Sequence, residues 1–279
     1  MRIAITGASG FVGRHVLHEL ITRELDTTVA RHQRSPTEHA TCINEVSFDL
    51  HARVANPFDA LGKPDLLMHF AWSGLPHYAS QHHLESELTA QAAFLTASVK
   101  AGIRRILVVG TCFEYGLVSG EIQETQPLHP VTRYGEAKAR LFAQLSELRE
   151  IVPFDLTWPR LFYLFGVGQS PSSLYSQLQA AIARGDQRFD MSGGQQVRDY
   201  LPASEAARLL VEVALRARDA GAINICSGTP VRLKDQVARW ISEAKSPIHM
   251  DLGKFPYPEF EPMEFWGSRR KLDAILGDA

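Results

Sequence analysis

Short apolar runs alternate with longer amphipathic stretches along the first half of the chain. The apolar runs have the length of buried strands and lie at 2–6, 27–30, 45–50, 65–71, 105–110 and 154–158. Apolar residues recur at helical spacing over 11–24, 82–101 and 134–149, and Gly102 ends the second of these stretches. Strands joined by crossover helices predict an α/β fold with a doubly wound parallel sheet, covered by helices on both faces.

Beyond residue 165 the spacing of the apolar segments becomes less regular. A loop-like segment at 166–173 is followed by helical stretches at 174–184, 203–217 and 233–244, a strand at 222–226 and a segment with three prolines at 255–262. We therefore expect one domain at 1–165 and a smaller lobe at 166–279, from which about 200–226 returns to the first domain.

The composition is that of a globular protein, because 45% of the residues are hydrophobic and 22% are charged. The 29 Lys and Arg residues nearly balance the 31 Asp and Glu residues, so we expect no nucleic-acid or membrane surface spread over the chain. The cysteines at 42, 112 and 226 fit no disulfide framework and no CxxC pair. No apolar run approaches the ~18 residues needed to span a bilayer, and the chain opens on a strand pattern rather than a signal peptide. These features predict a soluble, cytoplasmic protein.

A glycine-rich segment, GASGFVG at 7–13, follows the first strand directly and opens the first helix. Gly7 would permit a tight turn, Gly10 a close approach of a pyrophosphate to the backbone, and Gly13 close packing of the helix on the strand. The helix N-terminus presents free N–H groups and a partial positive charge to phosphates. The segment predicts a dinucleotide site, although its spacing is GxxGxxG and a turn without a ligand is the alternative.

The second strand ends without the acidic residue that would accept hydrogen bonds from a ribose hydroxyl. Arg31 and Arg34 follow instead, and arginines favour a 2′-phosphate. The sequence therefore favours NADP(H), with NAD(H) possible if these arginines are solvated loop charges. Asp49, at the end of the third predicted strand, is placed either to meet the adenine or to cap the strand.

A tyrosine and a lysine four residues apart, Tyr134 and Lys138, share one face of a predicted helix. A nearby cation favours the phenolate, so the lysine is expected to lower the pKa of the phenol and fit it for acid–base catalysis. Thr111 ends the fifth predicted strand, at the sheet edge where such folds bind ligands. Its hydroxyl can donate to a substrate oxygen beside the phenol, or it can cap the following loop.

Further segments accompany these motifs, namely HFAW at 69–72, GTCFEYG at 110–116, PRLFYLFG at 159–166 and RDYLPASEAA at 198–207. With the glycine loop and YGEAK at 134–138, they resemble the extended short-chain dehydrogenase/reductases, specifically the NAD(P)-dependent nucleotide-sugar epimerases, dehydratases and reductases. The resemblance extends over essentially the whole chain. It implies a Rossmann domain for the dinucleotide, a C-terminal lobe for a nucleoside-diphosphate sugar, and a homodimer formed through the helices at about 82–101 and 134–149.

The resemblance also implies roles for individual residues. Thr111, Tyr134 and Lys138 match the catalytic triad, and Lys138 would also hold the nicotinamide ribose. Arg198 matches an arginine on the sugar-nucleotide phosphates, with an ion pair to Asp199 as the alternative. The expected cofactor site comprises Gly7, Gly10, Phe11, Val12, Gly13, Arg31, Arg34, Asp49, Leu50, Phe70, Ala71, Trp72, Tyr134 and Lys138. The expected substrate site comprises Trp72, Ser73, Thr111, Glu114, Tyr134, Tyr163 and Arg198.

Departures from the family's pattern narrow the expected reaction. Dehydratases place Asp and Glu directly after the catalytic threonine, where this chain has Cys112 and Phe113, so dehydration is not expected. GTCFEYG and HFAWSGLP are similar to reductases of nucleotide-linked 4-keto-6-deoxyhexoses, in which hydride reaches C4 and the tyrosine gives the proton. A 4-epimerase that retains NAD and a non-catalytic dinucleotide sensor are the alternatives. The histidines at 77, 82 and 83 fit no common zinc spacing, so no metal is expected.

Overall fold

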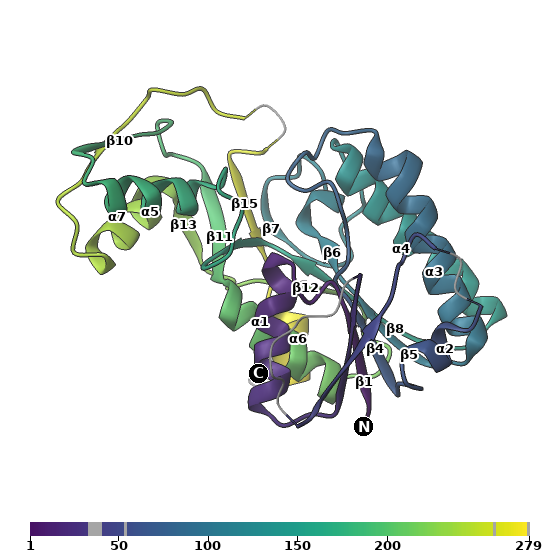
Figure 1. The fold of residues 1–279 in the computed structure, drawn as a ribbon. Helices are drawn as coiled ribbons and strands as arrows, with labels where there is room; N and C mark the ends of the chain where they lie inside the picture. The colour runs from purple at the N-terminus through teal and green to yellow at the C-terminus, as the bar shows by residue number, and fades with distance from the viewer. Residues whose placement is uncertain (33–40, 53–54, 259–260, 278–279) are drawn as a thin grey trace.

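The central element of the fold is a parallel sheet, seen in a computed structural model that describes residues 1–32, 41–52, 55–258 and 261–277 (Figure 1). Within these residues its strand order is β12-β8-β5-β4-β1-β2-β3, with β6 beside β8. The strands are β1 (Ile3–Thr6), β2 (Thr27–Arg31), β3 (Ile43–Ser47), β4 (Leu66–His69), β5 (Arg105–Val108), β6 (Gly110–Thr111), β8 (Asp155–Leu161) and β12 (Gly221–Ile225). This topology confirms the predicted doubly wound α/β fold.

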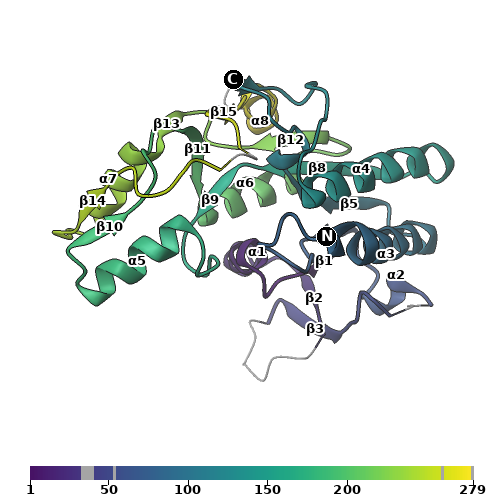
Figure 2. The ribbon, with the colours of Figure 1, turned by 90° about the horizontal axis from the view of Figure 1, so that it is seen from above.

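Helices cover both faces of this sheet (Figure 2). One layer contains α1 (Phe11–Thr22), α6 (Ala203–Arg216) and α8 (Arg270–Leu276), and the other contains α2 (Pro57–Ala60), α3 (Leu88–Ala101) and α4 (Arg133–Ile151). The strand period of two divides the core between the layers, because Ile3 and Ile5 pack on the first layer and Ala4 on the second. Each face of the sheet is therefore mainly apolar, as expected for a parallel sheet covered on both sides.

A smaller sheet joins the large one to the lobe. Its order among the described residues is β13-β11-β15-β7, with β9 beside β11. Its strands are β7 (Gly120–Ile122), β9 (Tyr163–Phe165), β11 (Val197–Pro202), β13 (Pro230–Arg232) and β15 (Glu264–Gly267). The lobe adds α5 (Leu174–Arg184), α7 (Leu233–Glu243) and the paired strands β10 (Arg188–Asp190) and β14 (His249–Asp251). Trp240 lies at the centre of the lobe core, where its ring contacts those of Phe165, Tyr175 and Tyr200.

Several short elements were not predicted from the sequence. The strands of the smaller sheet other than β11, together with β10 and β14, have only three or four residues, too few to show a period of two. The third strand of the large sheet is Ile43–Ser47 rather than 45–50, so Asp49 follows the strand instead of ending it. The helix expected at 82–101 begins with a π-helical turn, η1 (His83–Glu87), before α3.

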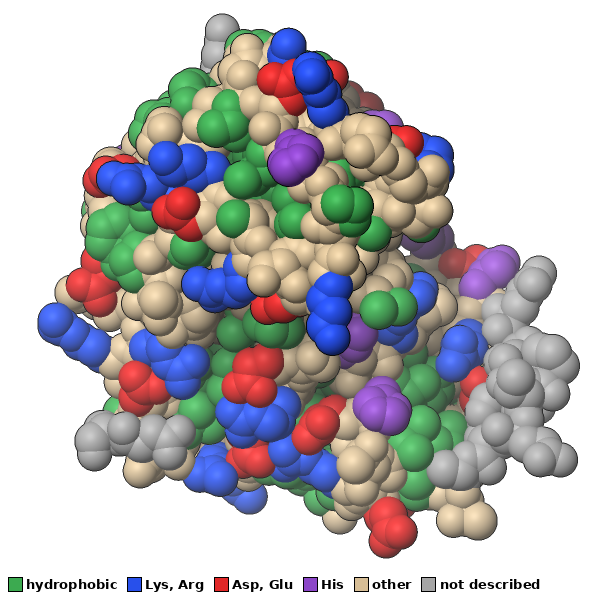
Figure 3. Space-filling view, turned by 90° about the vertical axis from the view of Figure 1, so that its left-hand side faces the viewer, with side chains coloured by type: hydrophobic (Ala, Val, Ile, Leu, Met, Phe, Trp, Pro, Cys, Tyr) green, Lys and Arg blue, Asp and Glu red, His purple; other side chains and the backbone are tan. Residues whose placement is uncertain are grey.

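The surface carries charges of both signs, interspersed on the face shown in Figure 3. Directly after α1, for example, Arg23 lies 2.7 Å from Glu19 of that helix and 2.6 Å from Glu212 of α6. No helix in the described part of the chain is both long and apolar enough to cross a membrane.

Candidate active site

The glycine loop between β1 and α1 is packed too tightly for side chains. Gly7 has φ +73°, and a Cβ at this position would lie 2.4 Å from the amide nitrogen of Ala71. A Cβ at Gly13 would lie 2.1 Å from the carbonyl oxygen of Gly7. The loop thus leads directly into the N-terminus of α1, whose first turn has no acidic residue. Arg14 folds back and donates to the carbonyl of Ser9 (3.0 Å), which adds positive charge where phosphates would bind.

A cavity of about 750 Å³ lies beside this loop, at the carboxyl ends of β1 and β2. It is lined by Thr6, Gly7, Ser9, Ala30, Arg31, His32, Phe48, Asp49, Leu50, His51 and Ala71. Asp49 Oδ1 accepts a hydrogen bond from the amide of His51 (2.9 Å), so this carboxylate caps the turn after the strand as well as lining the cavity. The close glycine packing, the open helix end and the adjoining cavity fit the phosphates and the adenosine part of a dinucleotide.

Arg31 has a carboxylate partner that the sequence did not indicate. Its Nε lies 2.8 Å from Oε1 of Glu45 on the adjacent strand β3. The ion pair compensates the charge on which the expectation of NADP(H) depended, and Arg34 lies outside the described residues. The structure therefore weakens the argument for a 2′-phosphate at this position.

The start of α4 brings Tyr134 and Lys138 to the carboxyl edge of the large sheet. The Tyr134 amide donates to the Tyr78 carbonyl (3.0 Å), and a Cβ at Gly135 would lie 2.5 Å from the Phe113 carbonyl oxygen. The helix start therefore lies directly against the turn that follows Thr111, η2 (Cys112–Glu114).

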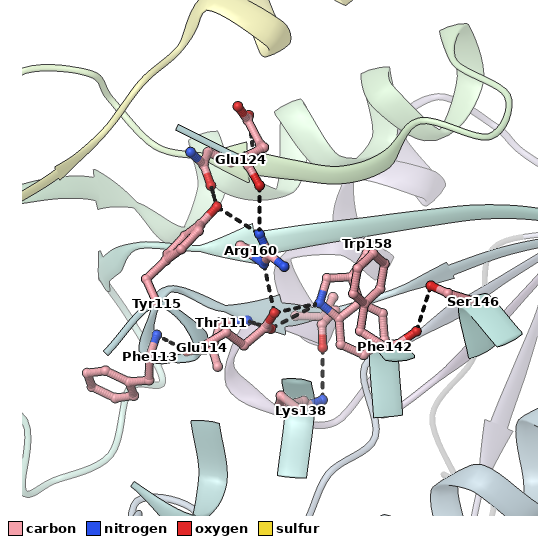
Figure 4. Close-up of polar contacts among 12 residues, drawn as sticks. Thr111, Phe113, Glu114, Tyr115, Glu124, Lys138, Phe142, Ser146, Trp158 and Arg160 are labelled. Atoms are coloured by element: carbon pink, nitrogen blue, oxygen red, sulfur yellow. Dashed lines mark hydrogen bonds and ion pairs between the residues drawn. The ribbon is translucent and has the colours of Figure 1, made fainter. Parts of the chain in front are cut away.

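Lys138 is buried and points at the backbone of the sheet (Figure 4). Its Nζ donates to the Val109 carbonyl oxygen (2.8 Å) and lies 3.9 Å from the centroid of the Trp72 ring. The same nitrogen is 5.9 Å from the centroid of the Tyr134 ring, and the Trp72 and Tyr134 centroids are 5.8 Å apart. Lys138, Trp72 and Tyr134, all expected at the site, thus lie close together.

Thr111 caps the turn that follows it. Its Oγ1 accepts from the Phe113 amide (3.3 Å), and its own amide donates to Glu114 Oε1 (2.8 Å), forming a capping box. A hydroxyl that accepts this hydrogen bond can still donate its own hydrogen. Capping and a hydrogen bond to a substrate oxygen are therefore compatible.

Glu114 requires a correction, because we expected its side chain to contact the sugar. The carboxylate is fully buried, at 2.7 Å from Nε of Arg160 and 3.0 Å from Nε1 of Trp158 (Figure 4). With the Thr111 amide as a further donor, its oxygens are occupied by the protein. The structure gives Glu114 the role of supporting the strand end that presents Thr111.

The charge states of the two catalytic candidates also differ from the expectation. Burial raises the pKa of Tyr134, with a further increase from the nearby Tyr78, instead of Lys138 lowering it. Burial lowers the pKa of Lys138 to about 7. At neutral pH Tyr134 is therefore a phenol with a proton to give, and Lys138 loses its charge easily because burial disfavours the ammonium.

Ser73, another expected substrate contact, is held by a buried carboxylate. Its amide and Oγ donate to Glu87 (3.1 and 2.7 Å), and Oγ also lies 2.7 Å from His82 Nε2. Gln91 Nε2 donates to the same carboxylate. The amide oxygen of Gln91 contacts His69 Nε2, and the other ring nitrogen of His69 contacts the Thr6 hydroxyl beside the glycine loop.

In the part of the chain that the structure describes, no group of three or more His, Cys, Asp and Glu side chains could hold a metal ion.

Arg198 and Tyr163 lie together on the side of the smaller sheet. The Arg198 guanidinium carbon is 5.2 Å from the Tyr163 ring centroid, and its Nη2 donates to Glu261 Oε2 (2.9 Å). The predicted alternative partner, Asp199, instead accepts from the amides of Ser227 and Gly228.

A row of aromatic rings connects this pair to the catalytic candidates. The Tyr134 and Tyr78 centroids are 5.7 Å apart, Tyr78 and Phe113 5.0 Å, and Phe113 and Tyr163 6.5 Å. The row of rings thus links Tyr134 of the large domain to Tyr163, which lies beside Arg198.

Two side chains of this region were not predicted from the sequence. Glu261 lies in the proline-containing segment, which carries no motif, and it reaches Arg198 only through the fold. Arg160 stands inside the PRLFYLFG segment and was not singled out, although an arginine in an apolar strand is itself a signal for a buried acidic partner.

Comparison with known proteins yields a family and several relatives. The model of the NAD dependent epimerase/dehydratase family matches residues 3–226. The chain is 26% identical over 272 residues to dTDP-6-deoxy-L-talose 4-dehydrogenase (NAD(+)) of Aggregatibacter actinomycetemcomitans, covering 96% of this chain and 100% of the relative. It is 24% identical to dTDP-glucose 4,6-dehydratase of Actinoplanes sp., covering 80% of this chain and 75% of that one.

A solved structure, that of MoeE5 in complex with UDP-glucuronic acid and NAD, has the same fold. It superimposes with a TM-score of 0.80 at 25% identity, covering 99% of this chain and 93% of MoeE5.

Proposed function

Since the family model matches most of its length, the chain belongs to the NAD dependent epimerase/dehydratase family, and we propose that it reduces a nucleoside-diphosphate 4-keto-6-deoxy sugar at C4. The observation that carries the proposal is the cluster of Tyr134, Lys138 and Trp72 next to the glycine loop. Support for the position of the reaction comes from the relative matched over its whole length, whose name is that of a 4-dehydrogenase of a 6-deoxy sugar nucleotide.

The catalytic residues have different tasks in this reaction. NAD(H), when bound, supplies the hydride. Tyr134 gives its proton to the oxygen of the C4 carbonyl, a role for which its raised pKa keeps it protonated. Thr111 donates its hydroxyl hydrogen to the same oxygen and polarises the carbonyl. Lys138 holds the nicotinamide ribose and can replace the proton that Tyr134 gives up, since its own pKa is lowered to about 7.

The rest of the substrate would lie toward the lobe. Trp72, Ser73 and Tyr163 border the sugar, and Arg198 binds the diphosphate through its guanidinium. The Glu261 carboxylate accepts a hydrogen bond from that guanidinium, so we expect the diphosphate to displace Glu261.

Dehydration remains disfavoured on chemical grounds. The thiol of Cys112 is buried and its pKa is raised by that burial, so it is protonated and a poor base at neutral pH. Phe113 has no group that transfers protons.

A second candidate, a 4-epimerase that retains NAD, is favoured by the Arg31–Glu45 ion pair, because this pair removes the main argument against NAD. Purified epimerase would carry NAD and interconvert two sugars without net consumption of added NADH. Net oxidation of NADH by a 4-keto sugar nucleotide would exclude this candidate.

Replacing Tyr134 by Phe tests the proposal directly. The change removes the proton donor and leaves the ring, so we expect kcat to fall by about 10²–10⁴-fold, the usual contribution of a general acid. The dissociation constant for NADH, measured by fluorescence titration, should change little. Substantial residual turnover would remove Tyr134 from the mechanism.

The cofactor assignment makes a second prediction. We expect the protein to bind NADH more tightly than NADPH, because Glu45 compensates Arg31 and would repel a 2′-phosphate. Glu45→Gln should reduce the preference for NADH by about threefold to tenfold, the size of a partly exposed charge interaction. Tighter NADPH binding by the unaltered protein would restore the role first expected for Arg31.

A further inference from the structure

His83 is fully buried beside the catalytic cluster and has a partner for each ring nitrogen. Nδ1 lies 3.1 Å from the indole nitrogen of Trp72, and Nε2 lies 3.0 Å from the carbonyl oxygen of His77. An indole N–H only donates and a carbonyl only accepts, so Nδ1 must be unprotonated and Nε2 must carry the hydrogen. The two contacts therefore fix one neutral tautomer of the imidazole.

Trp72 connects this histidine to the catalytic lysine. It lies in the loop after β4, outside any regular element, so its backbone alone does not fix the orientation of the ring. The indole N–H donates a hydrogen bond to His83 Nδ1, and the face of the ring covers Lys138 Nζ, which lies 3.9 Å from the ring centroid. Rotation of the indole away from His83 would remove this cation–π contact and open space around the amine.

We propose that His83 is a positioning residue for the catalytic reaction, because it anchors the Trp72 indole against Lys138. The proposal rests on the function proposed above for Lys138 and Tyr134. His83 acts through Trp72, and the imidazole is itself neither a proton donor to the substrate nor a metal ligand in this arrangement.

Protonation of His83 would break the anchor, because a proton on Nδ1 would face the indole N–H. The groups that face the imidazole are His82, Glu87, Lys138 and Tyr134, with ring centroids 6.0 Å away for His82 and 5.4 Å away for Tyr134. Burial is the main reason that the pKa of His83 is lowered. The anchor is therefore intact at neutral pH and is lost only in acid.

The contact can be measured in the cofactor-free protein by the indole N–H signals of the four tryptophans in a ¹H–¹⁵N spectrum. Trp72→Phe identifies the Trp72 signal by its disappearance. We expect His83→Leu to shift this signal and to speed its exchange with water. His83→Gln should preserve it, because a glutamine offers one acceptor and one donor without titrating. His77→Leu is the matched control, since His77 contributes only its backbone carbonyl.

Kinetics then test the role of the contact. His83→Leu should lower kcat about tenfold to thirtyfold, the size of a buried cation–π contact, with a much smaller change in the KM for the sugar. His83→Gln should retain most of kcat and lose the part of the acid limb of the pH profile that His83 contributes. Trp72→Phe in the His83→Leu background should cost no more than Trp72→Phe alone, because both changes remove one hydrogen bond.

Each result decides one question. An unchanged Trp72 signal in His83→Leu overturns the contact, and a changed signal with unchanged kcat overturns the positioning role. Additive losses of kcat in the double variant would also overturn the positioning role of His83. If the unaltered protein reduces no 4-keto sugar nucleotide, the proposed function fails while the spectrum still reports on the anchor.

Discussion

Arg160 and Arg198 are both 2% exposed, yet their surroundings differ. Arg160 lies at the end of the large sheet in a closed network. Its partner Glu114 is fully buried and also accepts a hydrogen bond from Trp158 Nε1. The Tyr115 hydroxyl oxygen accepts a hydrogen bond from Nη1 of Arg160 at 3.0 Å (Figure 4). Each member of this network is held by regular structure or by another member, so no position is open to a ligand.

Arg198 lies on the smaller sheet in an open pair. Backbone carbonyls of Val197 and Met263 hold one side of the guanidinium. The only carboxylate paired with it among the described residues is Glu261, which is 19% exposed and lies outside any helix or strand. The two arginines are equally buried, and the difference lies in the partner, because Glu261 is partly exposed and Glu114 is not. This difference is the basis on which the proposed function assigns the diphosphate to Arg198.

The largest effect is expected from the closed network. Glu114→Gln leaves Arg160 as an uncompensated buried charge, which costs about 3–5 kcal/mol of unfolding free energy. Denaturant-induced unfolding measures this loss. Glu136→Gln, which removes the half-buried partner of the exposed Arg133 and Arg140, is the control and should cost about 0.5 kcal/mol or less. Equal losses in the two variants would contradict the distinction between the networks.

Arg198→Leu should act on binding more than on stability. Glu261 can turn into water once its partner is removed, so the loss of unfolding free energy should stay near 1 kcal/mol. The dissociation constants of nucleoside diphosphates, measured by calorimetry across dTDP, UDP, GDP and CDP, should rise about tenfold to a hundredfold, as for a charged hydrogen bond. Unaltered binding together with a large loss of stability would make Arg198 a second Arg160.

The smallest effect, and the sharpest test of the open pair, is expected from Glu261→Gln. If the diphosphate displaces this carboxylate, its neutralisation should strengthen nucleoside diphosphate binding about threefold, as expected for a partly exposed ion pair. The same titrations measure it, with Glu243→Gln as a control at the end of α7. Weaker binding would show that Glu261 supports the bound substrate instead of competing with it.

The features that could be predicted from the sequence are those whose partners lie close along the chain. The turn at Gly7–Gly13 and the shared face of Tyr134 and Lys138 follow from local backbone geometry. Arg31 with Glu45 depends on the register of neighbouring strands, and Arg198 with Glu261 spans 63 positions. The pKa of Tyr134 was predicted in the wrong direction because spacing reports the nearby cation but not the burial that outweighs it.

The smaller sheet and the lobe are assembled from separate stretches of the chain, and this matters to anyone who wishes to exchange their specificity. Strand β7 comes before α4, β9 to β11 come after it, and β13 to β15 follow the return of the backbone to the large sheet through α6 and β12. A chimera that grafts one contiguous block from a relative would therefore mix pieces of two recognition surfaces. Transplanting the surface whole requires the exchange of three separate blocks, namely β7, β9 to β11 and β13 to β15, with a junction at both ends of each block.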